Sequence, residues 1–147
     1  MSRAEQFAEL PDDVVRHWLS FGQWDRVFFP KLVGIVVEEV RADYCRMVMP
    51  HRPELEQPAG LVHGGAIATL LDSVVVPAVG AAYGPEARYS TVDMHVQFLS
   101  AVTGQDILAE GWVVKRGRRV VFCESEAVNA TTGVVVAKSM LTYNVSI

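Results

Sequence analysis

A histidine followed by two glycines opens a long apolar segment of this 147-residue chain. His63, Gly64 and Gly65 precede a run, residues 66–82, whose residue types predict a helix. Glycines leave the backbone open to a ligand, and the first N–H groups of a helix have no partner within it. Donors at the positive end of the helix dipole bind an oxygen that carries negative charge. We therefore expect an anion-stabilising site here, with the N–H of Gly65 as the main donor and that of Gly64 as a second.

One carboxylate lies inside this apolar run. Asp72 has leucines and valines as sequence neighbours, and Thr69 and Ser73 are the other polar residues of the run. Burying an unpaired carboxylate costs several kcal/mol, so a core alone would not select Asp at this position. A carboxylate can deprotonate a water or attack a carbonyl itself. Asp72 is our candidate catalytic carboxylate, and the sequence leaves both routes open.

Length and composition predict a single globular domain over residues 1–147, with residues 1–30 as an N-terminal helical extension. Half of the residues are hydrophobic and a fifth are charged, which excludes a disordered chain. The net charge of −4 argues against nucleic-acid binding. The sequence contains no recognisable signal peptide or membrane span, so we expect a cytoplasmic protein. Cys45 and Cys123 are expected to be small buried hydrophobes, and no metal site is predicted.

The hydrophobic periodicity predicts an α+β fold. One or two short helices end near Gly22, and the long helix runs from Gly64 to about Tyr83, with a kink at Pro77. β-Branched and alternating residues predict five or six antiparallel strands. They fall in residues 32–49 with a turn at 41–43, then 90–100, 106–115, 119–130 and 134–145. A curved sheet wrapped around one central helix accommodates these elements.

With these elements in place, the motifs resemble those of a known family. Gln57, the turn of residues 63–65 and Asp72, followed by residues 90–94 and a Gly-Arg-Arg hairpin, resemble the hotdog-fold acyl-CoA thioesterases. The resemblance is to the branch of the phenylacetate-degradation and Arthrobacter-type 4-hydroxybenzoyl-CoA thioesterases, and covers residues 30–145. It implies a hotdog domain that forms a homodimer, two of which commonly make a homotetramer. It also implies that the His-Gly-Gly turn of one chain faces the acid of its partner.

The resemblance implies hydrolysis of an acyl-CoA thioester, with CoA as part of the substrate and no separate cofactor. Gly65 would stabilise the oxyanion and Asp72 would act as base or nucleophile. Gln57 can orient the water or the acyl carbonyl, and Thr91 is a hydroxyl that can hold the water. His63 would either position the loop and the thioester or carry a proton. Asp72 matches the phenylacetate-degradation pattern and Gln57 the Arthrobacter-type pattern, so aryl, medium-chain and long-chain acyl groups all stay open.

A basic stretch offers partners for the phosphates of CoA. Arg116, Arg118 and Arg119 lie in residues 115–119, and arginine forms bidentate bonds with phosphate. Arg88, ahead of a predicted strand, is a further candidate. A solvated hairpin with no ligand is the alternative.

Two other functions are compatible with a hotdog fold. The first is an enoyl-thioester hydratase or dehydratase, although the spacing of His63 and Asp72 fits hydrolysis better. The second is a non-catalytic acyl-CoA-binding regulator. Such a regulator usually carries a DNA-binding segment, and residues 1–30 hold five acidic and three basic side chains, which is unsuited to DNA.

Overall fold

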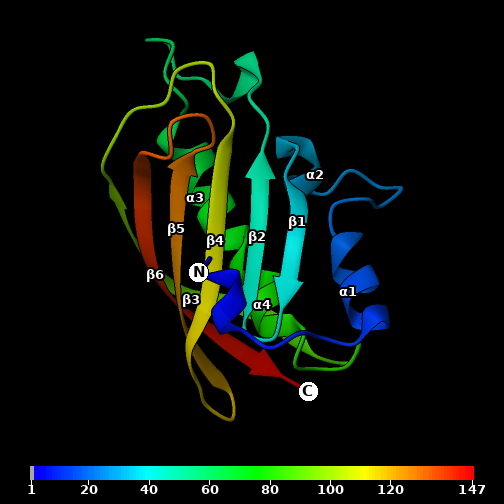
Figure 1. The fold of residues 1–147 in the computed structure, drawn as a ribbon. Helices are drawn as coiled ribbons and strands as arrows, with labels where there is room; N and C mark the ends of the chain where they lie inside the picture. Colours follow the sequence, from blue (N-terminus) through cyan, green and yellow to red (C-terminus); the bar gives the residue numbers. More distant parts are fainter. Residues whose placement is uncertain (1) are drawn as a thin grey trace.

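The computed structural model describes residues 2–147, which form one six-stranded antiparallel sheet around a central helix (Figure 1). The N-terminal part holds a 3₁₀ turn and two short helices, and another 3₁₀ turn precedes the central helix. Their bounds are η1 Ala4–Gln6, α1 Asp12–Leu19, α2 Phe29–Val33 and η2 Pro53–Leu55. The central helix consists of α3 Gly64–Ser73 and α4 Val75–Gly80. The strands are β1 Val36–Arg41, β2 Tyr44–Met49, β3 Arg88–Phe98, β4 Ile107–Arg116, β5 Val120–Asn129 and β6 Val135–Ser146.

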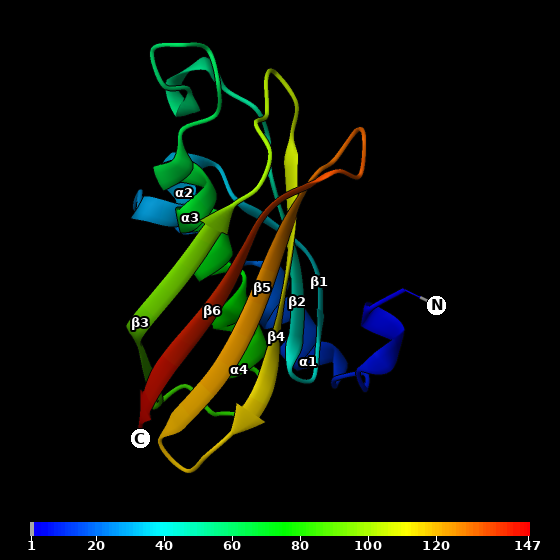
Figure 2. The ribbon, with the colours of Figure 1, turned by 90° about the vertical axis from the view of Figure 1, so that its left-hand side faces the viewer.

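The sheet has the order β1-β2-β4-β5-β6-β3, and every neighbouring pair is antiparallel. It curves so that α3 and α4 lie in its concave face, whereas η1 lies on the opposite side (Figure 2). This arrangement confirms the predicted hotdog fold of five or six strands around one long helix. One element was missed, because α2 follows Gly22, where the N-terminal helices were expected to end. None of the helices in residues 2–147 is long and apolar enough to cross a membrane.

The central helix is interrupted just after Asp72. Helix α3 ends at Ser73, four residues before Pro77, and α4 begins at Val75, two residues before it. Proline cannot donate to the carbonyl four residues earlier, and its ring crowds that turn. The kink predicted at Pro77 is therefore confirmed, and it lies beside the candidate carboxylate.

The core lies between the central helix and the sheet. Leu70, Leu71, Val74, Val75 and Val79 of the helix are completely buried. They pack against the inward side chains of the strands, which include Cys45, Met47, Ile107, Ala109, Val121, Cys123 and Leu141. Both cysteines are buried free thiols, as predicted.

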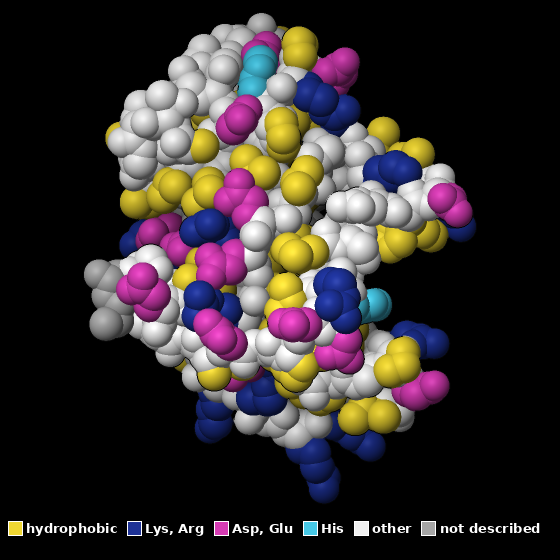
Figure 3. All heavy atoms as spheres, turned by 45° about the vertical axis from the view of Figure 1, so that its right-hand side comes forward, with side chains coloured by type: hydrophobic (Ala, Val, Ile, Leu, Met, Phe, Trp, Pro, Cys, Tyr) yellow, Lys and Arg dark blue, Asp and Glu magenta, His cyan; other side chains and the backbone are white. Residues whose placement is uncertain are grey.

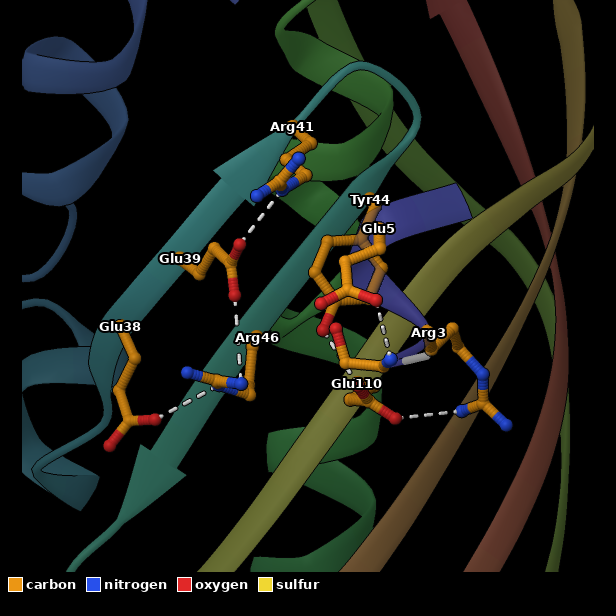
Figure 4. Close-up of polar contacts among 9 residues, drawn as sticks. Arg3, Glu5, Glu38, Glu39, Arg41, Tyr44, Arg46 and Glu110 are labelled. Atoms are coloured by element: carbon orange, nitrogen blue, oxygen red, sulfur yellow. Dashed lines mark hydrogen bonds and ion pairs between the residues drawn. The ribbon is translucent and has the colours of Figure 1, made fainter. Parts of the chain in front are cut away.

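The convex face of the sheet carries ion pairs (Figure 3). Arg46 of β2 lies 3.1 Å from Glu38 of β1. Arg3, beside η1, lies 2.9 Å from Glu110 of β4, and its guanidinium sits 3.9 Å above the ring centre of Trp112. Figure 4 shows how these side chains alternate in charge across the first three strands of the sheet. The contacts of Arg3 hold the N-terminal turn on the face opposite to α3.

One glycine sets how closely the helix approaches the sheet. A Cβ at Gly111 of β4 would lie 2.8 Å from a methyl group of Val74 and 2.8 Å from one of Val75. Both valines are completely buried at the interruption of the helix, so they have little room to move.

We expect Gly111→Ala to lower the free energy of unfolding by about 1–3 kcal/mol, the usual cost of overpacking a core. Gly84→Ala is the matched control, because a Cβ there would meet nothing within 4 Å. Urea unfolding of both variants checks this. Equal stability of the two variants would contradict the close helix-to-sheet contact.

Candidate active site

Asp72 is half-buried at the end of α3 and accepts hydrogen bonds from two hydroxyl groups of the sheet. Thr91 Oγ1 of β3 lies 2.8 Å from Asp72 Oδ1, and the Tyr143 hydroxyl of β6 lies 2.8 Å from the same oxygen. Burial raises the pKa of Tyr143, and the negative charge of Asp72 raises it further. The phenol therefore stays protonated and donates. Two hydroxyl groups thus offset the cost of partly burying this carboxylate.

Sheet hydroxyls also bind the backbone where the helix is interrupted. Ser125 Oγ of β5 donates to the Leu71 carbonyl at 3.0 Å, and the Tyr143 hydroxyl lies 2.9 Å from the Asp72 carbonyl. A buried carbonyl without a donor costs about 1–3 kcal/mol, so these bonds stabilise the interrupted helix. They also fix the position of Asp72 relative to β5 and β6.

The start of α3 is capped by the histidine of the motif. His63 Nδ1 accepts a hydrogen bond from the Gly65 N–H at 2.8 Å, and the His63 carbonyl accepts one from the Ala66 N–H at 2.9 Å. An imidazole that accepts at Nδ1 carries its proton on Nε2 in the neutral form. The predicted donor Gly65 is thus occupied by His63 in this chain. Among residues 2–147 the Gly64 N–H has no partner, so Gly64 is the open donor of this helix start.

Gln57 lies on one side of the helix start and His63 on the other. Gln57, Gly64 and Phe98 line a hollow of about 390 Å³ that faces β3. His63 and Gly65 line a separate hollow of about 460 Å³ that faces α2. Gln57 Oε1 accepts a hydrogen bond from the Ala59 N–H at 2.6 Å. The structure therefore brings Gln57 beside Gly64 and places it in a different hollow from Gly65.

The helix start and Asp72 are too far apart within one chain to act on one carbonyl. Asp72 lies seven positions after Gly65 in α3, which corresponds to about 10 Å along the axis. Reacting atoms must lie about 3–3.5 Å apart. One chain therefore holds two separate groups: a helix start with backbone donors, and a carboxylate held by Thr91 and Tyr143.

Arg116 has a structural role that the sequence did not indicate. Its guanidinium donates to the Val79 carbonyl at 3.2 Å and the Ala78 carbonyl at 3.3 Å, both at the end of α4, and to the Asp43 carboxylate. Terminal carbonyls of a helix need such donors. Arg116 is half-buried and committed to the fold, so the prediction that it binds substrate phosphate is corrected.

The other predicted phosphate ligands are exposed. Arg118 and Arg119 lie in the β4–β5 hairpin and line a shallow hollow with Val145 and Ile147. Arg88 donates through Nη1 to the carbonyl of Glu86 at 3.1 Å, within the loop that precedes β3. Arg118 and Arg119 therefore stay available to a ligand, and Arg88 is partly used by its own loop.

Sequence reasoning missed Tyr143 and Ser125. The alternation of β6 places Leu141, Tyr143 and Val145 on the buried face, and a tyrosine there needs a partner for its hydroxyl. This alternation can be read from the sequence. The register between β6 and β3, which pairs Tyr143 with Thr91, cannot. In residues 2–147 no group of three His, Cys, Asp or Glu side chains is placed to hold a metal ion.

The fold and site define a hotdog domain with a carboxylate in its central helix, and comparisons with known proteins agree. Acyl-coenzyme A thioesterase 13 of Mus musculus is 32% identical over 80 residues, which cover 54% of this chain and 56% of that protein. This chain thus spans about half the length of the curated relatives it matches. The structure of a thioesterase family protein from Silicibacter pomeroyi has a TM-score of 0.79 and 25% identity, over 92% of this chain and 97% of that one.

The E. coli PaaI protein of the phenylacetic acid degradation operon shares the fold, with a TM-score of 0.76 and 16% identity over 87% of this chain and 91% of its own. The profile of the thioesterase superfamily matches residues 59–136, more than half of the chain. The chain belongs to the thioesterase superfamily.

The structural role of Arg116 predicts a loss of stability when it is replaced. Arg116→Gln removes the charge that binds two helix carbonyls and Asp43, so we expect the free energy of unfolding to fall by about 1.5–3 kcal/mol. Arg118→Gln, an exposed neighbour with no such contacts in the described chain, should change it by less than about 0.5 kcal/mol. Thermal or urea unfolding gives both values. If Arg116→Gln were as stable as Arg118→Gln, Arg116 would return to the candidate phosphate ligands.

Proposed function

We propose that this protein hydrolyses acyl-CoA thioesters to the free acid and CoA. The observation that carries the proposal is Asp72, a half-buried carboxylate held on one oxygen by Thr91 and Tyr143. Membership in the thioesterase superfamily supports the same reaction.

Asp72 would activate the attacking group. With Oδ1 held by two hydroxyl donors, the second oxygen is free to take a proton from a water or to attack the thioester carbon. In the first route the water oxygen bonds to the carbonyl carbon while its proton moves to Asp72. In the second route a mixed anhydride forms and water then cleaves it. In both routes the C–S bond breaks and CoA leaves as the thiol or thiolate.

The start of α3 would stabilise the negative charge on the carbonyl oxygen. Preformed backbone donors are worth about 10²- to 10³-fold in kcat. Gly64 has an open N–H, and Gly65 gains one when the His63 imidazole turns away. His63 then positions the donors, and Gln57, beside Gly64, can orient the thioester or the water.

A complete site needs two chains, because the half-sites of one chain lie about 10 Å apart along α3. Strand β3 is an 11-residue edge of the sheet, whereas α1 packs beside the other edge, β1. An open edge of this length favours pairing with a second copy. We propose a homodimer through β3, with dimers associating further into a tetramer.

Arg118, Arg119 and Arg88 are the proposed partners of the CoA phosphates.

The proposal predicts that Asp72→Asn lowers kcat for acyl-CoA hydrolysis by at least about 10²-fold, the scale of losing a general base. Asn retains an oxygen that can accept the bonds from Thr91 and Tyr143, so thermal stability should change little. The assay follows thiol release from acetyl-, hexanoyl-, palmitoyl-, phenylacetyl- and benzoyl-CoA.

Asp13→Asn is the matched control, because Asp13 is an exposed carboxylate on α1, outside the proposed dimer edge β3. It should keep the wild-type rate. A wild-type protein that binds these esters without releasing thiol would instead indicate a non-catalytic acyl-CoA-binding protein. Full activity of Asp72→Asn would mean that another residue is the catalyst.

A further inference from the structure

Tyr143 of β6 is buried, and both acceptors near its hydroxyl belong to Asp72. The hydroxyl oxygen lies 2.8 Å from the carboxylate oxygen Oδ1 and 2.9 Å from the backbone carbonyl oxygen. Burial raises the pKa of this phenol and the charge of Asp72 raises it further, so the hydroxyl keeps its proton. A neutral phenol donates that proton to an acceptor. Tyr143 therefore holds the side chain and the backbone of Asp72 from one fixed position in the sheet.

An irregularity in β3 lies beside the second hydroxyl that binds Asp72. The register of β3 against β6 shifts between Thr91 and Asp93, and Thr91 is paired with Tyr143 just before the shift. Such bulges re-aim side chains and are common next to active sites. Thr91 Oγ1 donates to Asp72 Oδ1 at 2.8 Å. Thr91 and Tyr143, neighbours across two strands, thus form a clamp of two hydroxyl donors on one carboxylate oxygen.

The clamp makes the two oxygens of Asp72 unequal. In an ionised carboxylate both oxygens accept hydrogen bonds, and bonds to a charged group are stronger than neutral ones. Oδ1 accepts two of them, whereas no donor among residues 2–147 binds Oδ2. The side chain is also fixed in rotation, because both donors come from the sheet while Asp72 belongs to the helix. Oδ2 is therefore the oxygen that is open to a reacting group.

We propose that Tyr143 is a positioning residue for the reaction, which acts by holding Oδ1 of Asp72 so that Oδ2 is the oxygen that reacts. This inference rests on the proposed function and deepens it. When Asp72 is a base, the water oxygen bonds to the thioester carbon and its proton moves to Oδ2. The C–S bond then breaks, and Oδ2 returns the proton to the leaving sulfur. When Asp72 is a nucleophile, Oδ2 forms the bond to carbon, and Oδ1 keeps both donors in the mixed anhydride.

A purely structural role is the alternative, because the same hydroxyl binds a carbonyl where the helix is interrupted. Tyr44 of β2 provides a matched control. It is completely buried, and its hydroxyl donates to the Glu110 carboxylate at 2.6 Å on the convex face (Figure 4). Tyr44→Phe and Tyr143→Phe thus each remove one buried phenol hydroxyl from a carboxylate, and only Tyr143→Phe touches Asp72.

We expect Tyr143→Phe to lower kcat by about tenfold or more, the scale of a lost bond to a charged group, and to change KM by less than about threefold. Tyr44→Phe should keep both constants. The assay uses the thioester that wild-type protein cleaves fastest, and urea unfolding gives the folded fraction to which each rate is referred. A kcat of Tyr143→Phe equal to that of Tyr44→Phe would overturn the proposal.

A double-mutant cycle tests whether Tyr143 acts through Asp72. In an Asp72→Asn background, Tyr143→Phe should change the residual kcat by less than about twofold, because the group that it positions is already lost. A residue that only stabilises the helix would lower kcat by the same factor in both backgrounds. Equal factors would therefore overturn the positioning role.

A spectroscopic measurement keeps the hydroxyl, and so covers the case in which Tyr143→Phe does not fold. 3-Fluorotyrosine is introduced at position 143 or at position 44, and its ¹⁹F resonance is recorded with Asp72 and with Asp72→Asn. The resonance at position 143 should shift when the carboxylate charge is removed, and the resonance at position 44 should not. An unshifted resonance at position 143 would show that the clamp does not exist.

The outcomes separate this inference from the proposed reaction. If wild-type protein releases no thiol from any thioester, the proposed reaction is wrong and the role of Tyr143 in it falls as well. If wild-type protein is active, Asp72→Asn is inactive and Tyr143→Phe is as active as Tyr44→Phe, the reaction stands and the positioning role is wrong.

Discussion

The site depends on the hydrogen bonds that tie an interrupted helix to the sheet. Pro77 interrupts the central helix just beyond Asp72, and sheet hydroxyls bind the carbonyl groups that precede the interruption. Tyr143 binds both the interrupted helix and the carboxylate, because its hydroxyl contacts the Asp72 carbonyl and the Asp72 side chain. The helix geometry and the placement of the carboxylate are therefore coupled. A core leucine at position 72 would remove the carboxylate that accepts from Thr91 and Tyr143, and leave Tyr143 the backbone carbonyl of residue 72.

The geometry of the same helix is the reason for proposing that two chains form a complete site. Its start provides backbone donors and its interruption provides a carboxylate, about two turns apart. The N–H donors of the helix start suit a carbonyl oxygen that gains negative charge, and the carboxylate suits an attacking water that loses a proton. In the proposed dimer these two groups come from different copies. Phe21, Trp24 and Phe29 line a hollow beside Asp72. The open edge of β3 offers a route to such pairing without any change in the chain itself.

Sequence reasoning recovered the fold because periodicity and turn residues mark elements locally. The six strands and the kinked helix agree with the predicted ranges within a few residues. Thr91, which was expected to hold the water, donates to Asp72 from β3, and its predicted role stays a prediction. It failed where the answer depends on register and on contacts between distant segments. Arg116 was assigned to phosphate with its neighbours because nothing local shows that β4 carries it back to the end of α4, and Tyr143 depends on the pairing of β6 with β3.

The most direct test of the shared site is complementation between two inactive variants. Asp72→Asn removes the carboxylate, and Gly64→Pro removes the open backbone donor at the first residue of α3, where proline is tolerated. Each variant alone should lose at least about 10²-fold in kcat. After the two are unfolded together and refolded, half of the dimers should be mixed, and each mixed dimer holds one intact site, so activity should recover to roughly a quarter of wild type. Recovery to that level is the predicted result. A mixture that stays as inactive as its components, although mixed dimers are detected by native mass spectrometry, would show that the helix start and Asp72 do not act together across two chains.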